Sequence, residues 1–329
     1  MPRVLLTAMA ASGALVACSP ADRAASPVVV ASVRQPATSL FFVAQGAGCL
    51  AREALTVDER TFELGRDALA LLRDGDADVA IAYETPLLRA ALVDGRLRVL
   101  TKLHTSTTNT RLVARQAASI RAFSDLRGKR IGLARGTNAD FFAEVALAAG
   151  GLNGTSAVSV DLAPDASVAA LARGEIDAAV LSDPYAGQAE QLLGPAGHTL
   201  VTNLYTEASL LITREDVLAT KQPALRRLVR ALACAERAAR DDPDRARAIV
   251  VARFPEQHAG AIAAQLERVT WGLGLDNVLA DVLRREREWL GRAGAADGPD
   301  LRQLVHVQLL GEVYPESVTL LPGNIVLRW

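Results

Sequence analysis

The chain has 329 residues, half of them apolar and 22% charged, which is enough apolar material for one large core or two moderate ones. The 36 basic and 37 acidic residues give a net charge of −1, so no charge excess draws the chain to nucleic acid or to an anionic membrane. Three cysteines and four scattered histidines show no spacing typical of a disulfide framework or a metal site. We therefore expect no nucleic-acid partner, no metal and no cofactor.

Residues 1–17 have the features of a signal peptide. Arg3 supplies a positive charge, and Val4–Ala17 is an uncharged apolar stretch that is shorter than the roughly 18 residues needed to span a bilayer. The tetrapeptide "LVAC" that ends at Cys18 resembles a bacterial lipobox, in which the cysteine is lipidated and becomes the new N-terminus. We expect Cys18 to be a lipid anchor, and a plain secretion signal is the alternative. Residues 18–27 then form a flexible tether.

From residue 28 onward, short β-rich runs alternate with helical patterns, which predicts mostly parallel sheets covered by helices up to about residue 205. The predicted strands are "VVVASVR" (28–34), "ADVAIAYE" (77–84), "KRIGLA" (129–134), "AVSVDLA" (157–163) and "DAAVLS" (177–182). Four amphipathic helices follow, within residues 223–242, 244–254, 258–270 and 276–290. We expect these four helices to pack as one layer against a sheet.

The two remaining cysteines lie far apart in the sequence. Cys49 falls in the first helical segment, and Cys234 falls in an apolar helix stripe. A disulfide bond between them could form in an oxidising compartment, but this placement favours two separate thiols.

An internal repeat links residues 73–86, "RDGDADVAIAYETP", to residues 172–184, "ARGEIDAAVLSDP". Each copy ends a helix with glycine, places an aspartate at a strand entry, and runs an apolar strand into an acid and a proline. Shared turn chemistry is one explanation of the pattern. We favour the other, two related α/β lobes whose equivalent strand ends face each other, because ligands bind at such carboxyl ends.

The chain resembles the solute-binding proteins of bacterial ABC importers in the nitrate, sulfonate, taurine and thiamine-precursor group. The segments that carry the resemblance are "LRDGDADVAIAYETP", "TRLVARQAASIRAFSDLRGKRIGLARGTNADFF" and "LARGEIDAAVLSDPY". Together with the lipobox, the resemblance covers roughly residues 15–205. It implies the type II periplasmic-binding fold, with two lobes that each have a central mostly parallel sheet flanked by helices, and a C-terminal helical layer.

The resemblance also implies an organisation and a function. Residues 28–115 and 206–329 would form lobe one and residues 116–205 lobe two, with extended crossings near 109–115 and 203–213. A small-molecule solute would be captured between the lobes by hinge closure and delivered to an ABC permease in the inner membrane. The protein would be a lipid-anchored monomer on the periplasmic or cell-surface face of a membrane.

Two loops are predicted to contact the solute. In "RGTNADFF", Thr137 or Asn138 is the N-cap of a helix whose free N–H groups suit an anionic or acceptor-rich group. In "RQPATSLFF", Gln35, Thr38 and Ser39 follow the first strand and could donate hydrogen bonds. Helix capping and turn formation explain the same residues without a ligand.

Two carboxylates, Glu84 and Asp183, occupy equivalent strand ends, with Thr85 and Tyr185 beside them. If both face the cleft, they disfavour a bare anion and favour a solute with N–H donors, such as a pyrimidine or an aminosulfonate. Capping of the following helices is the alternative. Tyr83 and Tyr185 could stack on a flat ligand.

The predicted ligand-binding residues are Gln35, Thr38, Ser39, Glu84, Thr85, Gly136, Thr137, Asn138, Asp183 and Tyr185, and no residue is predicted to be catalytic. A solute-sensing lipoprotein that signals to a membrane receptor is one alternative. Another is an enzyme that forms the thiamine pyrimidine with a lysine-bound pyridoxal phosphate, as in relatives within the group. None of Lys102, Lys129 and Lys221 is predicted at a strand end facing the cleft, so we expect no enzyme.

Overall fold

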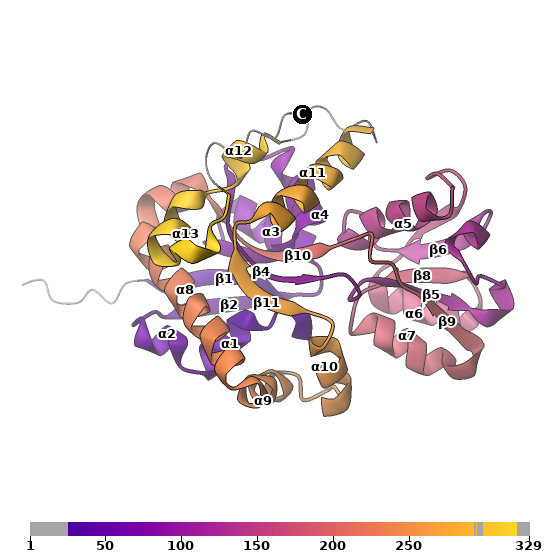
Figure 1. The fold of residues 1–329 in the computed structure, drawn as a ribbon, viewed down its shortest axis with the longest axis horizontal. Coiled ribbons are helices and arrows are strands. Elements are labelled where there is room, and N and C mark those ends of the chain that lie inside the picture. The colour runs from indigo at the N-terminus through magenta and orange to yellow at the C-terminus, as the bar shows by residue number, and fades with distance from the viewer. Residues whose placement is uncertain (1–25, 293, 295–298, 321–329) are drawn as a thin grey trace, which may run out of the picture.

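The computed structural model describes residues 26–292, 294 and 299–320, so the predicted signal peptide and Cys18 lie outside the described residues. The chain forms two α/β lobes (Figure 1). Lobe one holds a six-stranded sheet in the order β11-β4-β10-β3-β1-β2. Its strands are β1 (Val28–Val33), β2 (Val57–Phe62), β3 (Val79–Tyr83), β4 (Leu97–Ser106), β10 (Glu207–Arg214) and β11 (Thr270–Gly274). Its helices are α1 (Leu40–Gly46), α2 (Cys49–Arg52), α3 (Gly65–Asp74), α4 (Glu84–Ala91), α8 (Glu215–Asp241), α9 (Pro243–Arg253), α10 (Ala259–Leu266), α11 (Asn277–Arg292), α12 (Leu301–Leu304) and α13 (Val307–Val313).

Lobe two holds a five-stranded sheet in the order β7-β6-β8-β5-β9. Its strands are β5 (Arg111–Arg115), β6 (Arg130–Leu133), β7 (Val158–Asp161), β8 (Ala178–Leu181) and β9 (Gly197–Leu200). Its helices are α5 (Asn138–Ala149), α6 (Pro164–Arg173) and α7 (Tyr185–Leu193). All five predicted strands are confirmed, as β1, β3, β6, β7 and β8.

Each of the two sheets contains a group of parallel strands. In lobe one β1 pairs in parallel with β2 and β3, and in lobe two β6 pairs in parallel with β7 and β8. Every residue of β3 and of β8 is buried. This burial explains their apolar sequences, since a parallel strand covered on both faces has no solvent side.

The internal repeat corresponds to equivalent structure in the two lobes. Gly75 and Gly174 end α3 and α6 with φ of +92° and +76°, a left-handed conformation that favours glycine. The Asp78 carboxylate accepts the Val29 N–H of β1 at 2.9 Å. In the same way, Asp177 accepts the Arg130 N–H of β6 at 2.8 Å. Each aspartate thus ties the entry of its strand to the neighbouring strand.

Two crossings, residues 107–110 and 201–206, connect the lobes. The boundary predicted at residue 115 is wrong, because β5 pairs antiparallel with β8 and β9 and so belongs to the sheet of lobe two. The strand pattern of "RLVAR" is visible in the sequence, but nothing in it shows which sheet the strand joins. The second boundary lies where β9 ends and β10 begins.

The four C-terminal helices form, but they do not make one layer. Helices α8 and α9 pack against α1, whereas α11 packs against α4. Right-handed crossovers place α1 and α3 on opposite faces of the sheet, because the chain moves outward from β1 to β2 and then back to β3. Helix α4 packs with α3, so the C-terminal helices are divided between the two faces. Strand β11 separates α10 from α11 and extends the sheet at its edge.

Cys49 and Cys234 form a disulfide bond, contrary to the expectation of two separate thiols. Their Cα atoms lie 5.9 Å apart, and the bond joins α2 to α8. The prediction failed because the packing of α2 on α8 brings together residues separated by 185 positions. Among the described residues, no helix combines the length and the apolar character needed to cross a bilayer.

Candidate ligand-binding site

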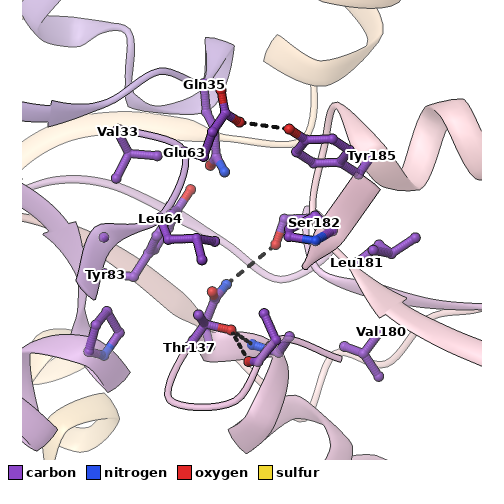
Figure 2. A pocket seen from close by; sticks show the side chains of 16 residues that line it. Val33, Gln35, Glu63, Leu64, Tyr83, Thr137, Val180, Leu181, Ser182 and Tyr185 are labelled. Atoms are coloured by element: carbon purple, nitrogen blue, oxygen red, sulfur yellow. Dashed lines mark hydrogen bonds between the residues drawn. The ribbon is translucent and has the colours of Figure 1, made fainter. Parts of the chain in front are cut away.

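A cavity lies between the two lobes (Figure 2). Its volume is about 40 Å³, well below the usual size of small-molecule sites. Lobe one contributes Val33, Gln35, Glu63, Leu64, Gly65, Tyr83 and Pro86. Lobe two contributes Ala134, Thr137, Asn138, Ala139, Pro164, Val180, Leu181, Ser182 and Tyr185.

The lining residues sit where parallel strands end and helices begin. Strands β1, β3 and β8 deliver their last residues, Val33, Tyr83 and Leu181, to the cavity. Helices α3, α5, α6 and α7 begin there, and their first residues, at positions 65, 138, 164 and 185, are part of the lining. Such N-termini present free N–H groups and the positive end of the helix dipole to a ligand.

The lobe-one wall combines neutral and acidic groups. The Tyr83 hydroxyl lies 3.4 Å from Nε2 of buried His104. Burial raises the pKa of Tyr83 well above its usual value and lowers the pKa of His104 to about 3, so both side chains are neutral. Gln35 Oε1 is buried without a hydrogen-bond partner among the described residues. Among the described residues that line the cavity, Glu63 is the one carboxylate, and none is a lysine, an arginine or a histidine.

The lobe-two wall is built around the start of α5. Thr137 is the N-cap: its hydroxyl accepts the Ala139 N–H at 3.3 Å and donates to the Ala134 carbonyl at 2.7 Å. The next residue, Asn138, donates from Nδ2 to Thr110 Oγ1 at 2.9 Å. A longer contact of 3.5 Å reaches Ser182 Oγ, the dashed line drawn at Ser182 in Figure 2.

The two walls are joined across the cleft. The Tyr185 hydroxyl of lobe two donates to Glu63 Oε2 of lobe one at 2.6 Å (Figure 2). Burial and this hydrogen bond raise the pKa of Tyr185, which keeps its proton on the hydroxyl. Nearby, the guanidinium of Arg89 in lobe one donates to Asp140 in lobe two at 2.9 Å. The structure therefore shows the lobes in direct contact at the rim of the cavity.

Four of the ten predicted ligand-binding residues line the cavity: Gln35, Thr137, Asn138 and Tyr185. Gly136 lies beside them with φ of +76°, but is not part of the lining. The Thr38 hydroxyl donates to the Val33 carbonyl at 2.8 Å, and the Ser39 hydroxyl donates to the Pro36 carbonyl. Both hydroxyls thus stabilise the turn after β1, which was the alternative explanation of these residues.

Glu84 does not face the cleft, contrary to expectation. Its carboxylate accepts the Tyr205 hydroxyl and the Ala208 N–H, the latter at 2.8 Å. Thr85 beside it donates to Glu286 at 2.5 Å. Burial raises the pKa of Glu84, and burial together with the charge of Glu84 raises that of Glu286 well above its usual value. The two acids form a buried pair inside lobe one.

Asp183 does not line this cavity either; it is almost completely buried and borders a second pocket, between α7 and α10. Its oxygens accept hydrogen bonds from Arg111 at 2.9 Å and from Arg268 at 3.3 Å, and the Gly187 N–H lies 3.2 Å away. A carboxyl group that is almost completely buried requires such partners. The argument that two carboxylates select the solute therefore does not apply to Glu84 and Asp183. The carboxylate at the cavity is Glu63.

Several lining residues were not found from the sequence, above all Glu63, Leu64 and Ser182. Glu63 and Leu64 follow β2, an edge strand whose charged residues hide its strand pattern. Half-buried and exposed positions alternate only along residues 57–60, and the sequence VDERTF contains no apolar run that marks the strand. Ser182 directly follows β8 and precedes Asp183, the residue to which the sequence argument assigned this position.

Two α/β lobes, two crossings and a cavity at the carboxyl ends of the strands define the two-lobed periplasmic-binding-protein fold. The sequence model of the NMT1/THI5-like family matches residues 35–246, and the chain belongs to this family. The resemblance found in the sequence is thereby confirmed at the level of the family and the fold.

Comparisons with individual proteins agree with this assignment. A Brucella abortus (strain 2308) protein, whose name proposes it as a binding protein, is 25% identical over 204 residues; the match covers 60% of this chain and 62% of that relative, less than two thirds of its length. The periplasmic aliphatic sulphonate binding protein SsuA from Escherichia coli superimposes with a TM-score of 0.72 at 18% identity, covering 88% of this chain and 99% of SsuA. The desulfurization enzyme DSZB has the same fold, with a TM-score of 0.68 at 18% identity, covering 88% of this chain and 99% of DSZB.

Proposed function

We propose that the protein is the exported solute-binding component of an ABC importer, which captures a small organic solute between its lobes and delivers it to a permease in the inner membrane. The observation that carries the proposal is the cavity itself, because both lobes contribute strand ends and helix N-termini to its lining. A solute held there contacts both lobes at once and stabilises the closed arrangement over the open one. A permease would recognise the closed form.

The lining supports a sulfonate- or taurine-like solute or a thiamine-pyrimidine-like solute. Helix N-termini favour acceptor-rich or anionic groups, whereas Glu63 and Gln35 Oε1 favour N–H donors. A molecule that carries both kinds of group, such as an aminosulfonate or an aminopyrimidine, satisfies both requirements. Tyr83 and Tyr185 lie on opposite sides of the cavity in Figure 2, where each offers an aromatic ring to a flat ligand.

We further propose that the site binds its solute without catalysing a reaction on it, although an enzyme shares the fold. The hydroxyl groups of the lobe-two wall are engaged in structural hydrogen bonds. Thr137 donates to the Ala134 carbonyl, and Ser182 lies 2.7 Å from the Thr110 hydroxyl. Among the described residues, no histidine or lysine contacts either hydroxyl to activate it as a nucleophile.

Export and membrane attachment are part of the proposal. The disulfide bond between Cys49 and Cys234 supports an oxidising compartment, because such bonds persist mainly outside the cytoplasm. Lipidation of Cys18 would anchor a monomer to the periplasmic or cell-surface face of a membrane, with residues 18–27 as the tether. Mass spectrometry of the protein purified from membranes tests the lipid on Cys18 directly.

The proposal is tested by a thermal-shift screen on protein that begins at Ala21 and has been stripped of carried-over ligand by unfolding and refolding. The panel contains alkanesulfonates, taurine, nitrate, bicarbonate, aminopyrimidines, thiamine and small amines. A solute at 100 times its Kd adds about 2.7 kcal/mol, which raises Tm by roughly 5 to 10 °C.

A matched pair of variants places the effect in the cavity. Glu63→Ala removes the lining carboxylate, so it should reduce the shift. Glu175→Ala removes a surface carboxylate that pairs with Arg173 away from the cavity, so it should leave the shift unchanged. The proposal fails if the folded, stripped protein responds to no compound of the panel, or if both variants respond as the unaltered protein does.

A further inference from the structure

The orientation of one amide, that of Asn138, decides which hydrogen-bonding groups the lobe-two wall offers to a solute. Asn138 lines the cavity as the first residue of α5 and is itself mostly buried. Its Nδ2 lies 3.0 Å from Glu207 Oε2 and 2.9 Å from Thr110 Oγ1. The two shorter contacts of the amide nitrogen are therefore with Glu207 and Thr110 at the crossings, and only the longer 3.5 Å contact reaches Ser182 of the cavity lining.

The side chain of Glu207 is fixed by burial and by hydrogen bonds. Glu207 is the first residue of β10, directly after the second crossing, and its side chain is almost completely buried. Oε1 accepts Asn109 Nδ2 at 2.5 Å, and Oε2 accepts the Thr110 hydroxyl as well as Asn138. Asn109 and Thr110 belong to the first crossing. Glu207 thus joins both crossings to a residue of the cavity.

The hydrogen bonds fix the identity of the two amide atoms. An ionised carboxylate only accepts hydrogen bonds, so the atom of Asn138 that faces ionised Glu207 is the nitrogen. Burial raises the pKa of Glu207 to about 8, and a proton on its carboxyl group can be directed at Thr110 while Oε2 still accepts from Asn138. In both protonation states Oδ1 has no hydrogen-bond partner among the described residues and is left for a solute.

We propose that Glu207 is a positioning residue that sets the hydrogen-bond polarity of the solute site: by holding the amide nitrogen of Asn138, it leaves the carbonyl oxygen Oδ1 to accept an N–H or O–H group of the solute. This inference rests on the proposed solute-binding function and adds a specificity determinant that does not touch the solute. It also ties the solute contact to the crossings, since Glu207 accepts from residues of the first crossing and begins the strand that follows the second.

Two substitutions of Glu207 distinguish positioning from general structural support. Glu207→Leu removes the acceptor and allows the Thr110 hydroxyl to donate to Asn138 Oδ1, which turns the amide nitrogen toward the cavity. Glu207→Gln keeps an acceptor for Asn138, because Asn109 Oδ1 is buried without a partner and can take up the new glutamine N–H group when the Asn109 amide rotates. The glutamine variant should therefore restore what the leucine variant loses.

The first readout needs no solute. In protein labelled with ¹⁵N-asparagine, the side-chain NH₂ signal of Asn138 is assigned by its loss in Asn138→Ala. We expect these protons to exchange at least tenfold more slowly with water than those of exposed asparagines in the unaltered protein and in Glu207→Gln, and to lose this protection in Glu207→Leu. Rapid exchange in the unaltered protein overturns the inference even if the leucine variant does not fold.

The second readout uses two probes with the same ring, 4-aminopyrimidine and 4-methoxypyrimidine, of which only the first carries N–H donors. We expect the unaltered protein and Glu207→Gln to prefer the amino compound by about tenfold or more, the size of one hydrogen bond that is made or left unpaired. Glu207→Leu should reduce the preference to within about threefold. An unchanged preference in the leucine variant overturns the inference. If neither probe binds the unaltered protein, the aminopyrimidine class of the proposed function fails, and the exchange measurement alone decides the role of Glu207.

Discussion

The disulfide bond between Cys49 and Cys234 gives a stability prediction whose size follows from the chain. Cys49 is fully buried in α2, and Cys234 lies in the C-terminal half of the long helix α8. The bond closes a loop between residues 185 positions apart, which restricts the unfolded chain far more than the folded one. For a loop of that length the chain-entropy relation gives about 5 kcal/mol of stabilisation, an upper value because packing of α2 on α8 persists without the bond.

The assay compares the oxidised and reduced forms of protein that begins at Ala21, which leaves Cys49 and Cys234 as its only cysteines. For a chain of this size we expect reduction to lower Tm by up to roughly 10 to 20 °C. The double variant Cys49→Ala, Cys234→Ala serves as the control, because reductant should not change its Tm. The reasoning is refuted if thiol titration finds two free thiols in the unreduced protein unfolded in denaturant. It is also refuted if reduction leaves Tm unchanged.

Two further predictions concern residues around the cavity. Burial raises the pKa of Glu207 from 4.5 to about 8, so the folded state holds a proton that the unfolded state releases. The stabilisation from this group is fully present below pH 4.5 and is lost as pH rises to 8. The loss in the free energy of unfolding is up to about 5 kcal/mol. Glu207→Gln, which stays neutral, should therefore flatten the fall in stability between pH 5 and pH 9 in urea unfolding, and an unchanged slope would contradict the assignment. Thr137→Ala removes the N-cap of α5 and should cost about 1 kcal/mol in the same assay, with Thr137→Ser close to the unaltered protein; equal losses in both variants would show that the cap is not the cause.

The sequence predicts the parallel strands β1, β3, β6, β7 and β8 but misses the edge strand β2, for a physical reason. Strands β3 and β8 are covered on both faces, so their residues are continuously apolar and stand out. Strand β2 lies at an edge, where Asp58, Glu59 and Arg60 are compatible with a half-exposed strand and conceal it from a search for apolar runs. The loop that follows β2 was missed together with the strand, and with it Glu63.

Local chemistry near helix N-termini was predictable. Thr137 and Asn138 lie where a strand, a glycine loop and a capping residue follow each other, and this order alone places them at a sheet edge. The same reasoning could not show where their side chains point. The orientation of Asn138 depends on Glu207, which lies 69 positions later in the chain and reaches it only through the folding of the second crossing.

The fate of the acids at the strand ends shows why such sites resist sequence analysis. A buried carboxylate must find donors, and the donors of Glu84 and Asp183 are Tyr205 and Arg268, 121 and 85 positions away. Nothing in the local pattern distinguishes these two acids from one that faces a ligand. Asp183 also accepts from Arg111 of its own lobe, whereas the donor to Glu63, the Tyr185 hydroxyl, comes from the opposite lobe. Glu63, the acid at the cavity, therefore has its partner only when the lobes meet. Opening the cleft would free Glu63 for a solute. A solute that donates to Glu63 would then compete with Tyr185 for the same oxygen.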